Sequence, residues 1–148
     1  MLELGQRERV VIGDVEVSIL LVKNPAGANE VLRTLALEPG EHDLLAILND
    51  NVADGRDVSW VWDADFEVLA GRVRHVTCSG TRAAEMALRL KYAGVPSERL
   101  VVEPALGAAL DRALADGGGA LYALPTYTAM LALREALVER GAARGSFV

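Results

Sequence analysis

The part of this 148-residue chain richest in groups that could do chemistry runs from residue 47 to residue 67. It holds six carboxylates, both tryptophans of the chain and a turn glycine, and it follows an apolar run at residues 44–48. A loop this dense in charged and aromatic side chains costs stability, so we expect that it serves a function. In an open α/β sheet, functional loops leave the carboxyl ends of strands. We call residues 49–67 the acidic loop. The alternative is a solvated loop whose tryptophans cover the sheet edge.

Closely spaced carboxylates can hold a cation, and the acidic loop at first resembles an EF-hand calcium loop. If Gly55 takes the invariant sixth position of an EF-hand, valines fall at the third and twelfth ligand positions. Valine cannot ligate calcium, which excludes the EF-hand. A different carboxylate site built from Asp50, Asp54 and Asp57 remains an alternative. Our expectation for this chain is that it holds no metal.

Three isolated side chains elsewhere could serve as a nucleophile or a base. Cys78 precedes a predicted helix, and a helix N-terminus lowers the pKa of a thiol. Free cysteines are usually buried, however, so we favour a cysteine packed in the core. His42 and His75 stand beside predicted strands without a Ser/His/Asp pattern, and we expect structural roles for both.

Two polar turns follow predicted strands and could bind an anion. The Ser-Gly-Thr-Arg turn at residues 79–82 offers backbone donors, two hydroxyls and a guanidinium. Its alternative is a plain helix cap made by Ser79 or Thr81. The segment at residues 23–29 begins with Lys23, which could meet a phosphate or carboxylate, or it is simply a strand-to-helix turn. Neither turn matches the glycine-rich dinucleotide fingerprint or the phosphate loop.

Hydrophobic periodicity predicts the elements that must position these turns. Two β-rich runs, at residues 10–12 and 15–22, surround Gly13-Asp14 and predict a hairpin. Further strands are predicted at residues 43–48, 73–78, 100–102 and 120–124. Apolar residues at i, i+3, i+4 and i+7 predict helices after the turn at 23–27, after Arg82, from Pro104 and after Thr126. A short helical turn is expected at residues 59–62, and a loose tail from Gly141.

Strands that alternate with helices through short connections predict parallel strands with crossover helices. The expected fold is therefore α/β and Rossmann-like: a mostly parallel sheet of about six strands, flanked by helices, with one antiparallel edge strand. The length suits a single domain over residues 1–148.

Composition excludes several classes of function. The net charge is −6 and no basic block occurs, which argues against nucleic acid as a partner. The one cysteine rules out an internal disulfide and suits a reducing cytoplasm. We see no run of transmembrane length and no signal-peptide pattern, and we expect a cytoplasmic protein.

Four motifs occur in chain order and together resemble a known family. They are LVKNPAG-x-NE at residues 21–30, NDN-x-ADGRD-x-SW-x-WD at 49–63, SGTR at 79–82 with LR-x-KYAG at 88–94, and LPTYTAM at 124–130. The chain resembles the C-terminal, Mur-ligase-like domain of MurT-type proteins, the ligase subunit of lipid II isoglutaminyl synthase. The resemblance covers nearly the whole chain, and the long aspartate–tryptophan motif is its most specific part.

The resemblance implies glutamine-dependent, ATP-driven amidation of the D-glutamate α-carboxylate in lipid II, the peptidoglycan precursor. A GatD-like class I glutamine amidotransferase releases the ammonia, and the ligase subunit activates the carboxylate at the cytoplasmic inner face of the membrane. ATP with Mg²⁺ is expected in the central Mur-ligase domain of the full-length subunit, and none bound by this domain alone. Because the phosphate loop and the cysteine-rich insertion are missing, we expect a domain of a longer protein or a short homologue, inactive by itself.

The same resemblance assigns roles to residues of the loops. It implies that Asp57 orients the histidine of the partner's Cys–His pair, with Asp50 and Asp54 as alternatives. Expected at the partner interface are Arg56, Ser59, Trp60 and Trp62. Expected to face nucleotide or substrate are Lys23, Asn24, Asn29, Ser79, Thr81 and Arg82. The competing hypothesis is a stand-alone protein-binding module whose acidic loop docks a partner or a cation without catalysis.

Overall fold

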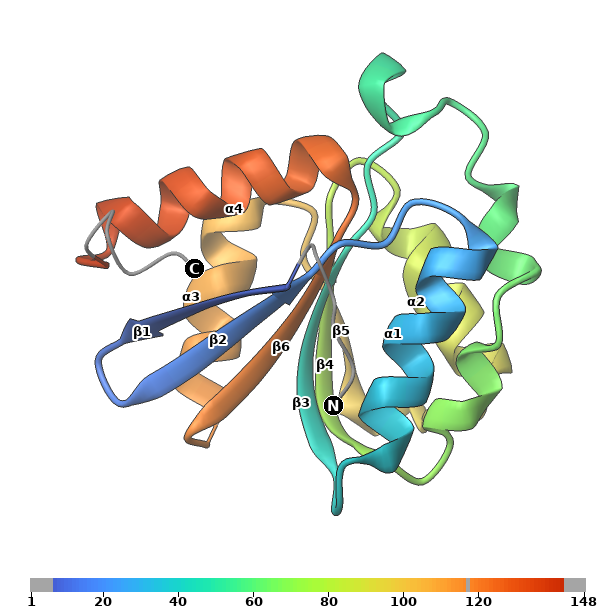
Figure 1. Cartoon of the computed structure of the whole chain (residues 1–148), viewed down its shortest axis with the longest axis horizontal. Coiled ribbons are helices and arrows are strands. Elements are labelled where there is room, and N and C mark those ends of the chain that lie inside the picture. The colour runs from blue at the N-terminus through green and yellow to red at the C-terminus, as the bar shows by residue number, and fades with distance from the viewer. Residues whose placement is uncertain (1–6, 117, 143–148) are drawn as a thin grey trace.

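The computed structural model describes residues 7–116 and 118–142, and these form one six-stranded sheet with helices on both faces (Figure 1). The strands are β1 (Arg7–Ile12), β2 (Val15–Leu20), β3 (His42–Ile47), β4 (Val73–Ser79), β5 (Leu100–Val102) and β6 (Ala120–Pro125). The helices are α1 (Pro25–Leu37), α2 (Ala83–Tyr92), α3 (Leu106–Asp116) and α4 (Tyr127–Glu139).

The strand order across the sheet is β1-β2-β6-β3-β4-β5. β1 pairs antiparallel with β2 at the edge, and every other pairing is parallel. The predicted α/β, Rossmann-like fold with one antiparallel edge strand is confirmed. Most of the tail expected to be loose, residues 143–148, lies outside the described residues.

The sheet separates two hydrophobic clusters, and β3 contributes to both because successive side chains of a strand point to opposite faces. Leu44, Ala46 and Leu48 belong to the cluster under α1 and α2, whereas Leu45 and Ile47 belong to the cluster under α3 and α4. This is why residues 44–48 form an unbroken apolar run: both faces of the strand are covered.

Local sequence chemistry explains where α1 begins, whereas a contact between distant segments accompanies the later start of α3. Asn24 precedes Pro25 and accepts the Gly27 N–H on its side chain at 2.8 Å, which is an ordinary N-cap followed by a proline in the first turn. Helix α3 begins at Leu106 and not at Pro104. The Pro104 carbonyl accepts the backbone N–H of Gly80 instead, at 3.2 Å, so the start of this segment is used to join α3 to the end of β4.

The acidic loop and the residues just after it form three short 3₁₀ turns. The first, η1 (Val52–Asp54), contacts α4, whereas η2 (Ser59–Trp62) and η3 (Phe66–Leu69) pack on the α1/α2 face. The second of these confirms the helical turn predicted at residues 59–62. The connection after β3 thus crosses one face of the sheet, whereas α4, which follows β6, covers the other (Figure 1). Neighbouring strands whose connections diverge in this way mark the switch point where ligands of open α/β sheets bind.

Within the described residues, no helix is both long and apolar enough to cross a membrane.

Candidate functional site

The turns that follow β3, β4 and β6 meet at the carboxyl edge of the sheet, and Asn49 connects them. Its backbone N–H donates to Thr126 Oγ1 at 3.1 Å and its Nδ2 donates to Thr128 Oγ1 at 3.0 Å. Its Oδ1 accepts the backbone N–H of Thr81 at 3.0 Å. One side chain at the start of the acidic loop therefore fixes the positions of two neighbouring turns.

The Ser-Gly-Thr-Arg turn packs directly against the end of β3. Gly80 has a φ of +97°, and a Cβ there would lie 2.5 Å from the Leu48 carbonyl oxygen, so the position requires glycine. The backbone N–H of Arg82 donates to the same carbonyl at 2.9 Å. The Ser79 hydroxyl donates to the Pro104 carbonyl, and no side chain caps α2. The backbone donors of this turn are bonded within the protein, which leaves little of it for an anion.

Asp50 is held by the β4 turn. Its carboxylate accepts the Thr81 hydroxyl at 2.9 Å and an Arg82 N–H at 3.3 Å, and the same guanidinium also pairs with Glu85. These interactions, with the Thr81 hydrogen bond the largest, hold the pKa of Asp50 below its ordinary value. The carboxylate is therefore charged and already committed to a neighbouring segment.

Asp54 is held by the start of α4. Its Oδ1 accepts the backbone N–H of Thr128 at 2.7 Å, and its Oδ2 accepts the Thr128 hydroxyl at 2.5 Å. Asn51 adds two bonds, from its backbone N–H to Asp54 and from its Nδ2 to Thr128 Oγ1. This acid anchors the first 3₁₀ turn of the loop to the helix behind it.

Asp57 differs from the other two acids, because the hydrogen bonds it makes among the described residues stay inside its own turn. It is exposed, and its Oδ1 accepts the backbone N–H of Ser59 at 2.9 Å. Hydrogen bonding from the side chain and then the backbone of Ser59 lowers the pKa of Asp57. The result is a charged, outward-facing carboxylate in a defined turn.

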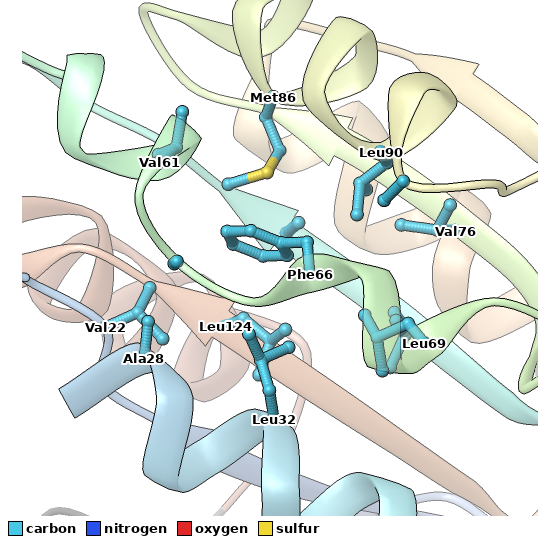
Figure 2. Close-up of a cluster of buried hydrophobic side chains, with 14 of the residues drawn as sticks. Val22, Ala28, Leu32, Val61, Phe66, Leu69, Val76, Met86, Leu90 and Leu124 are labelled. Carbon is cyan, nitrogen blue, oxygen red and sulfur yellow. The ribbon is translucent and has the colours of Figure 1, made fainter. Parts of the chain in front are cut away.

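Beneath Asp57, apolar side chains that recur every two or three residues attach the loop to the hydrophobic cluster under α1 and α2. Figure 2 shows Phe66 in the middle of the cluster, between Val61, Met86 of α2 and Leu32 of α1. The buried apolar side chains of the loop are Val58, Val61, Ala64 and Phe66, and Leu69 follows directly after it. This hydrophobic underside gives a polar loop a fixed shape.

The four residues expected at a partner interface lie close together in the chain but differ in exposure. Arg56 and Ser59 are exposed, and Trp60 is half-buried against the core. Trp62 is 39% exposed, lies edge-on to Tyr92 at 5.7 Å and donates its indole N–H to Glu85 at 3.2 Å. Trp62 is therefore bound to the surface of α2 and does not cover the sheet edge.

The residues expected to face a nucleotide or substrate fall into two groups, which lie at separate parts of the sheet edge. Lys23 and Asn24 line a hollow of about 430 Å³ together with Asp54, Gly55 and Tyr127, at the switch point, where the connections that follow β2, β3 and β6 meet. Asn24 caps α1, and the Oδ1 of Asn29 accepts the Asp65 N–H at 2.7 Å. Thr81 lines a second hollow, of about 440 Å³, beside the first turns of α3 and α4, whereas Ser79 is fully buried and Arg82 is bonded to Asp50 and Glu85. The structure does not bring the two groups into one site.

The three isolated residues have structural surroundings. Cys78 is fully buried, and burial raises the pKa of its thiol to about 12, so the core cysteine is confirmed and a thiolate nucleophile is not. His42 is buried, bonds the Leu35 carbonyl through Nε2 at 2.8 Å and lies edge-on to Tyr122. His75 pairs with Asp116 at 3.4 Å.

Over residues 7–116 and 118–142, no three histidine, cysteine, aspartate or glutamate side chains gather into a metal-binding group. The alternative carboxylate site is not assembled there, because Asp50 bonds the β4 turn and Asp54 bonds α4.

Sequence reasoning gave no role to Arg89, Asn49 or Thr128, although they carry much of the geometry. Arg89 is 2% exposed and donates to the carbonyls of Val61 and Ala64, both at 2.7 Å, and to Glu67 at 2.8 Å. The sequence offered one sign of the role of Arg89: it stands beside Met86 and Leu90 on the edge of an apolar helical face. A charge buried at such a position needs hydrogen-bond partners.

Comparisons with known proteins identify relatives of the chain. The family model described as "MurT ligase C-terminal" matches residues 21–130. The protein named lipid II isoglutaminyl synthase (glutamine-hydrolyzing) subunit MurT from Streptococcus pneumoniae is 39% identical over 137 residues, which is 92% of this chain and 31% of that protein. Its namesake from Staphylococcus aureus (strain COL) is 42% identical over 123 residues, 82% of this chain and 28% of that protein. The chain spans less than a third of the length of these relatives.

Proposed function

The chain belongs to the MurT ligase C-terminal family, and from this premise we propose that it is the C-terminal domain of a ligase subunit that amidates lipid II. In the proposed reaction, glutamine supplies ammonia and ATP activates the D-glutamate α-carboxylate. The support is the printed name of the relatives, which describes a glutamine-hydrolysing lipid II isoglutaminyl synthase subunit.

We assign the remaining steps of the reaction to another domain of the subunit and to a partner protein, both of which this chain would contact. ATP and Mg²⁺ belong to a central Mur-ligase domain, and the ammonia comes from a GatD-like glutaminase, at the cytoplasmic face of the membrane where lipid II is made. On this domain, Lys23 is the group suited to contact a phosphate or carboxylate, because it lines the hollow at the switch point. One lysine beside Asp54 fits the closing edge of such a site and is too little to hold a triphosphate alone.

The catalytic contribution proposed for this domain is the Asp57 carboxylate. A class I glutaminase uses a Cys–His pair, and an acid that bonds the histidine fixes its tautomer and stabilises its cation. The carrying observation is that Asp57 is exposed, charged and bonded inside its own turn, whereas Asp50 and Asp54 are bonded to other segments. Arg56, Ser59, Trp60 and Trp62 flank it and would form the contact with the glutaminase.

The test is Asp57→Asn in the full-length ligase subunit, assayed for glutamine hydrolysis with its glutaminase. The near-isosteric amide should leave the complex assembled in a pull-down while hydrolysis collapses. Loss of the orienting acid costs on the order of 10⁴ in serine proteases, and a smaller loss is expected here because a thiolate is the better nucleophile. Asp63→Asn, an exposed acid of the same loop, is the matched control.

Two outcomes would redirect the proposal. Parental activity in Asp57→Asn would exclude Asp57 as the orienting acid, and Asp50→Asn and Asp54→Asn would be assayed next. Failure of the pull-down would mean that the acidic loop is a docking surface, which is the binding-module alternative.

A further inference from the structure

We propose that Arg89 is a positioning residue for Asp57. Its buried guanidinium fastens one end of the segment that carries this carboxylate, residues 55–60, while Asp54 and Thr128 fasten the other. The inference rests on the proposed role of Asp57 and concerns how the fold holds that side chain in place.

A guanidinium buried to this extent is unusual and must be explained by what it bonds. Arg89 is 2% exposed, in a helix whose other inward side chains are apolar. Taking such a charge out of water is costly unless its donors are satisfied. Here they reach the carbonyl oxygens of Val61 and Ala64 and the carboxylate of Glu67, all within 2.8 Å. An apolar residue could pack α2 without that cost, so the distinctive contribution of the arginine is to the acidic loop.

The same guanidinium also holds aromatic rings of the loop. Its Cζ lies 5.2 Å from the ring centre of Trp62 and 5.4 Å from that of Phe66, within cation–π range. Trp62 is fixed further by Glu85 and Tyr92 of the same helix. The chain from Val61 onward is therefore attached to α2 through backbone, carboxylate and ring contacts that converge on one residue.

The other end of the segment is attached to a different helix. Asp54 accepts both the N–H and the hydroxyl of Thr128 in the first turn of α4. Helices α2 and α4 cover opposite faces of the sheet (Figure 1). The short stretch between Asp54 and Val61 thus spans the switch point, with its ends on two rigid elements and Val58 buried between them.

Asp57 depends on these two attachments because its own hydrogen bond, to Ser59, moves with the segment. Releasing either end would let the carboxylate shift while the turn around it stays intact. A displacement of about 1 Å in a catalytic group can cost up to about a hundredfold in rate. The effect should fall on kcat, because glutamine is bound by the glutaminase.

The test is a double-mutant cycle with Arg89→Met and Asp57→Asn in the full-length ligase subunit, assayed for glutamine hydrolysis with its glutaminase. Arg89→Met should lower kcat by about tenfold or more, with KM within about twofold. In the Asp57→Asn background, Arg89→Met should lower kcat by less than about twofold. A residue that acts through the Asp57 carboxylate has no effect once that carboxylate is gone.

The cycle separates failure of this inference from failure of the proposed function. Unchanged hydrolysis in Asp57→Asn alone refutes the role of Asp57 itself. If Asp57→Asn is impaired but Arg89→Met keeps its kcat, or if the two losses multiply, Asp57 keeps its role and Arg89 does not position it.

Arg89→Met leaves two carbonyl groups without their donor, so Thr128→Val provides an independent release at the other end. Valine keeps the shape of threonine and removes the hydroxyl, which donates to Asp54 and accepts from Asn49 and Asn51, all in the first part of the acidic loop. It should show the same lowered kcat and the same lack of effect in the Asp57→Asn background. Parental kcat in Thr128→Val would overturn the two-ended attachment.

A structural measurement on the 148-residue chain gives a result that does not need activity. Both tryptophans lie in the acidic loop, so their emission reports only this loop. Acrylamide should quench it more strongly in Arg89→Met and Thr128→Val. The matched control is Arg140→Met, since Arg140 likewise bonds two carbonyls and a carboxylate, those of Ala136, Gly107 and Asp111. Quenching that changes equally in all three variants, or in none, would overturn the inference.

Discussion

Asp54 and Thr128 are 74 positions apart in the chain, yet two hydrogen bonds join them, at 2.7 and 2.5 Å. Helix α4 begins after Thr126, whose side chain makes no capping bond. The carboxylate of Asp54 instead accepts a first-turn N–H, where the helix dipole favours a negative charge. A loop that follows β3 therefore supplies the N-terminal cap of the helix that follows β6, and the two turns on either side of the switch point are held as one unit.

Asp54→Ala should lower the free energy of unfolding by about 1–2 kcal/mol, the cost of losing a helix cap. Urea unfolding monitored by circular dichroism measures the change. The control is Asp63→Ala in the same loop, an exposed acid expected to stay within about 0.5 kcal/mol of the parent. Equal effects from both variants would show that Asp54 contributes only charge and no cap.

Gly80→Ala should be more damaging, by at least about 2 kcal/mol, because it combines strain at positive φ with a collision against backbone. The new Cβ would lie 2.5 Å from the Leu48 carbonyl oxygen, which cannot move without disturbing β3. Gly13→Ala separates the two causes. Gly13 also has a positive φ, +59°, but has open space around it, so only about 1 kcal/mol of strain is expected. Comparable melting temperatures for the two variants would refute the close approach.

The arrangement of elements could be predicted because each depends on neighbours in the sequence. The apolar run at residues 44–48 indicates a strand buried on both faces, and β3 has that environment. The edge hairpin follows from two β-rich runs around Gly13-Asp14. These patterns are local, and tertiary contacts did not override them.

The candidate site was less predictable, because its contacts join distant segments. Nothing local to Arg89 shows that it bonds Val61 and Ala64, more than 20 positions away. Asn24 is a different case: it was assigned to a nucleotide-facing edge, although an asparagine directly before a proline is the ordinary start of a helix. Its Oδ1 is occupied as a cap, although the residue lines the same hollow as Lys23, so Lys23 is the cation of that pair suited to a phosphate or carboxylate.

The last prediction concerns pH, through Cys78. The thiol is fully buried in β4, and removal from water alone raises its pKa to about 12. In the unfolded chain the thiol ionises near pH 8.5. Between these two pH values the unfolded state loses a proton that the folded state keeps. The contribution of the thiol to the free energy of unfolding is therefore fully present below about pH 8.5 and declines as the pH rises toward 12, by up to about 1.4 kcal/mol per pH unit.

Cys78→Ala removes this dependence. The variant should be less stable than the parent at pH 7, because a buried sulfur is lost, and the difference should shrink between pH 8.5 and 10 as the parent weakens. Chemical unfolding at several pH values measures it, and lysine and tyrosine titrations cancel in the comparison. The same burial predicts that a thiol reagent at pH 8 reacts only as fast as the chain opens. Parallel stability curves for parent and variant, or rapid thiol reaction in the native chain, would show that the thiol is reached by water and that β4 is not covered as the structure has it.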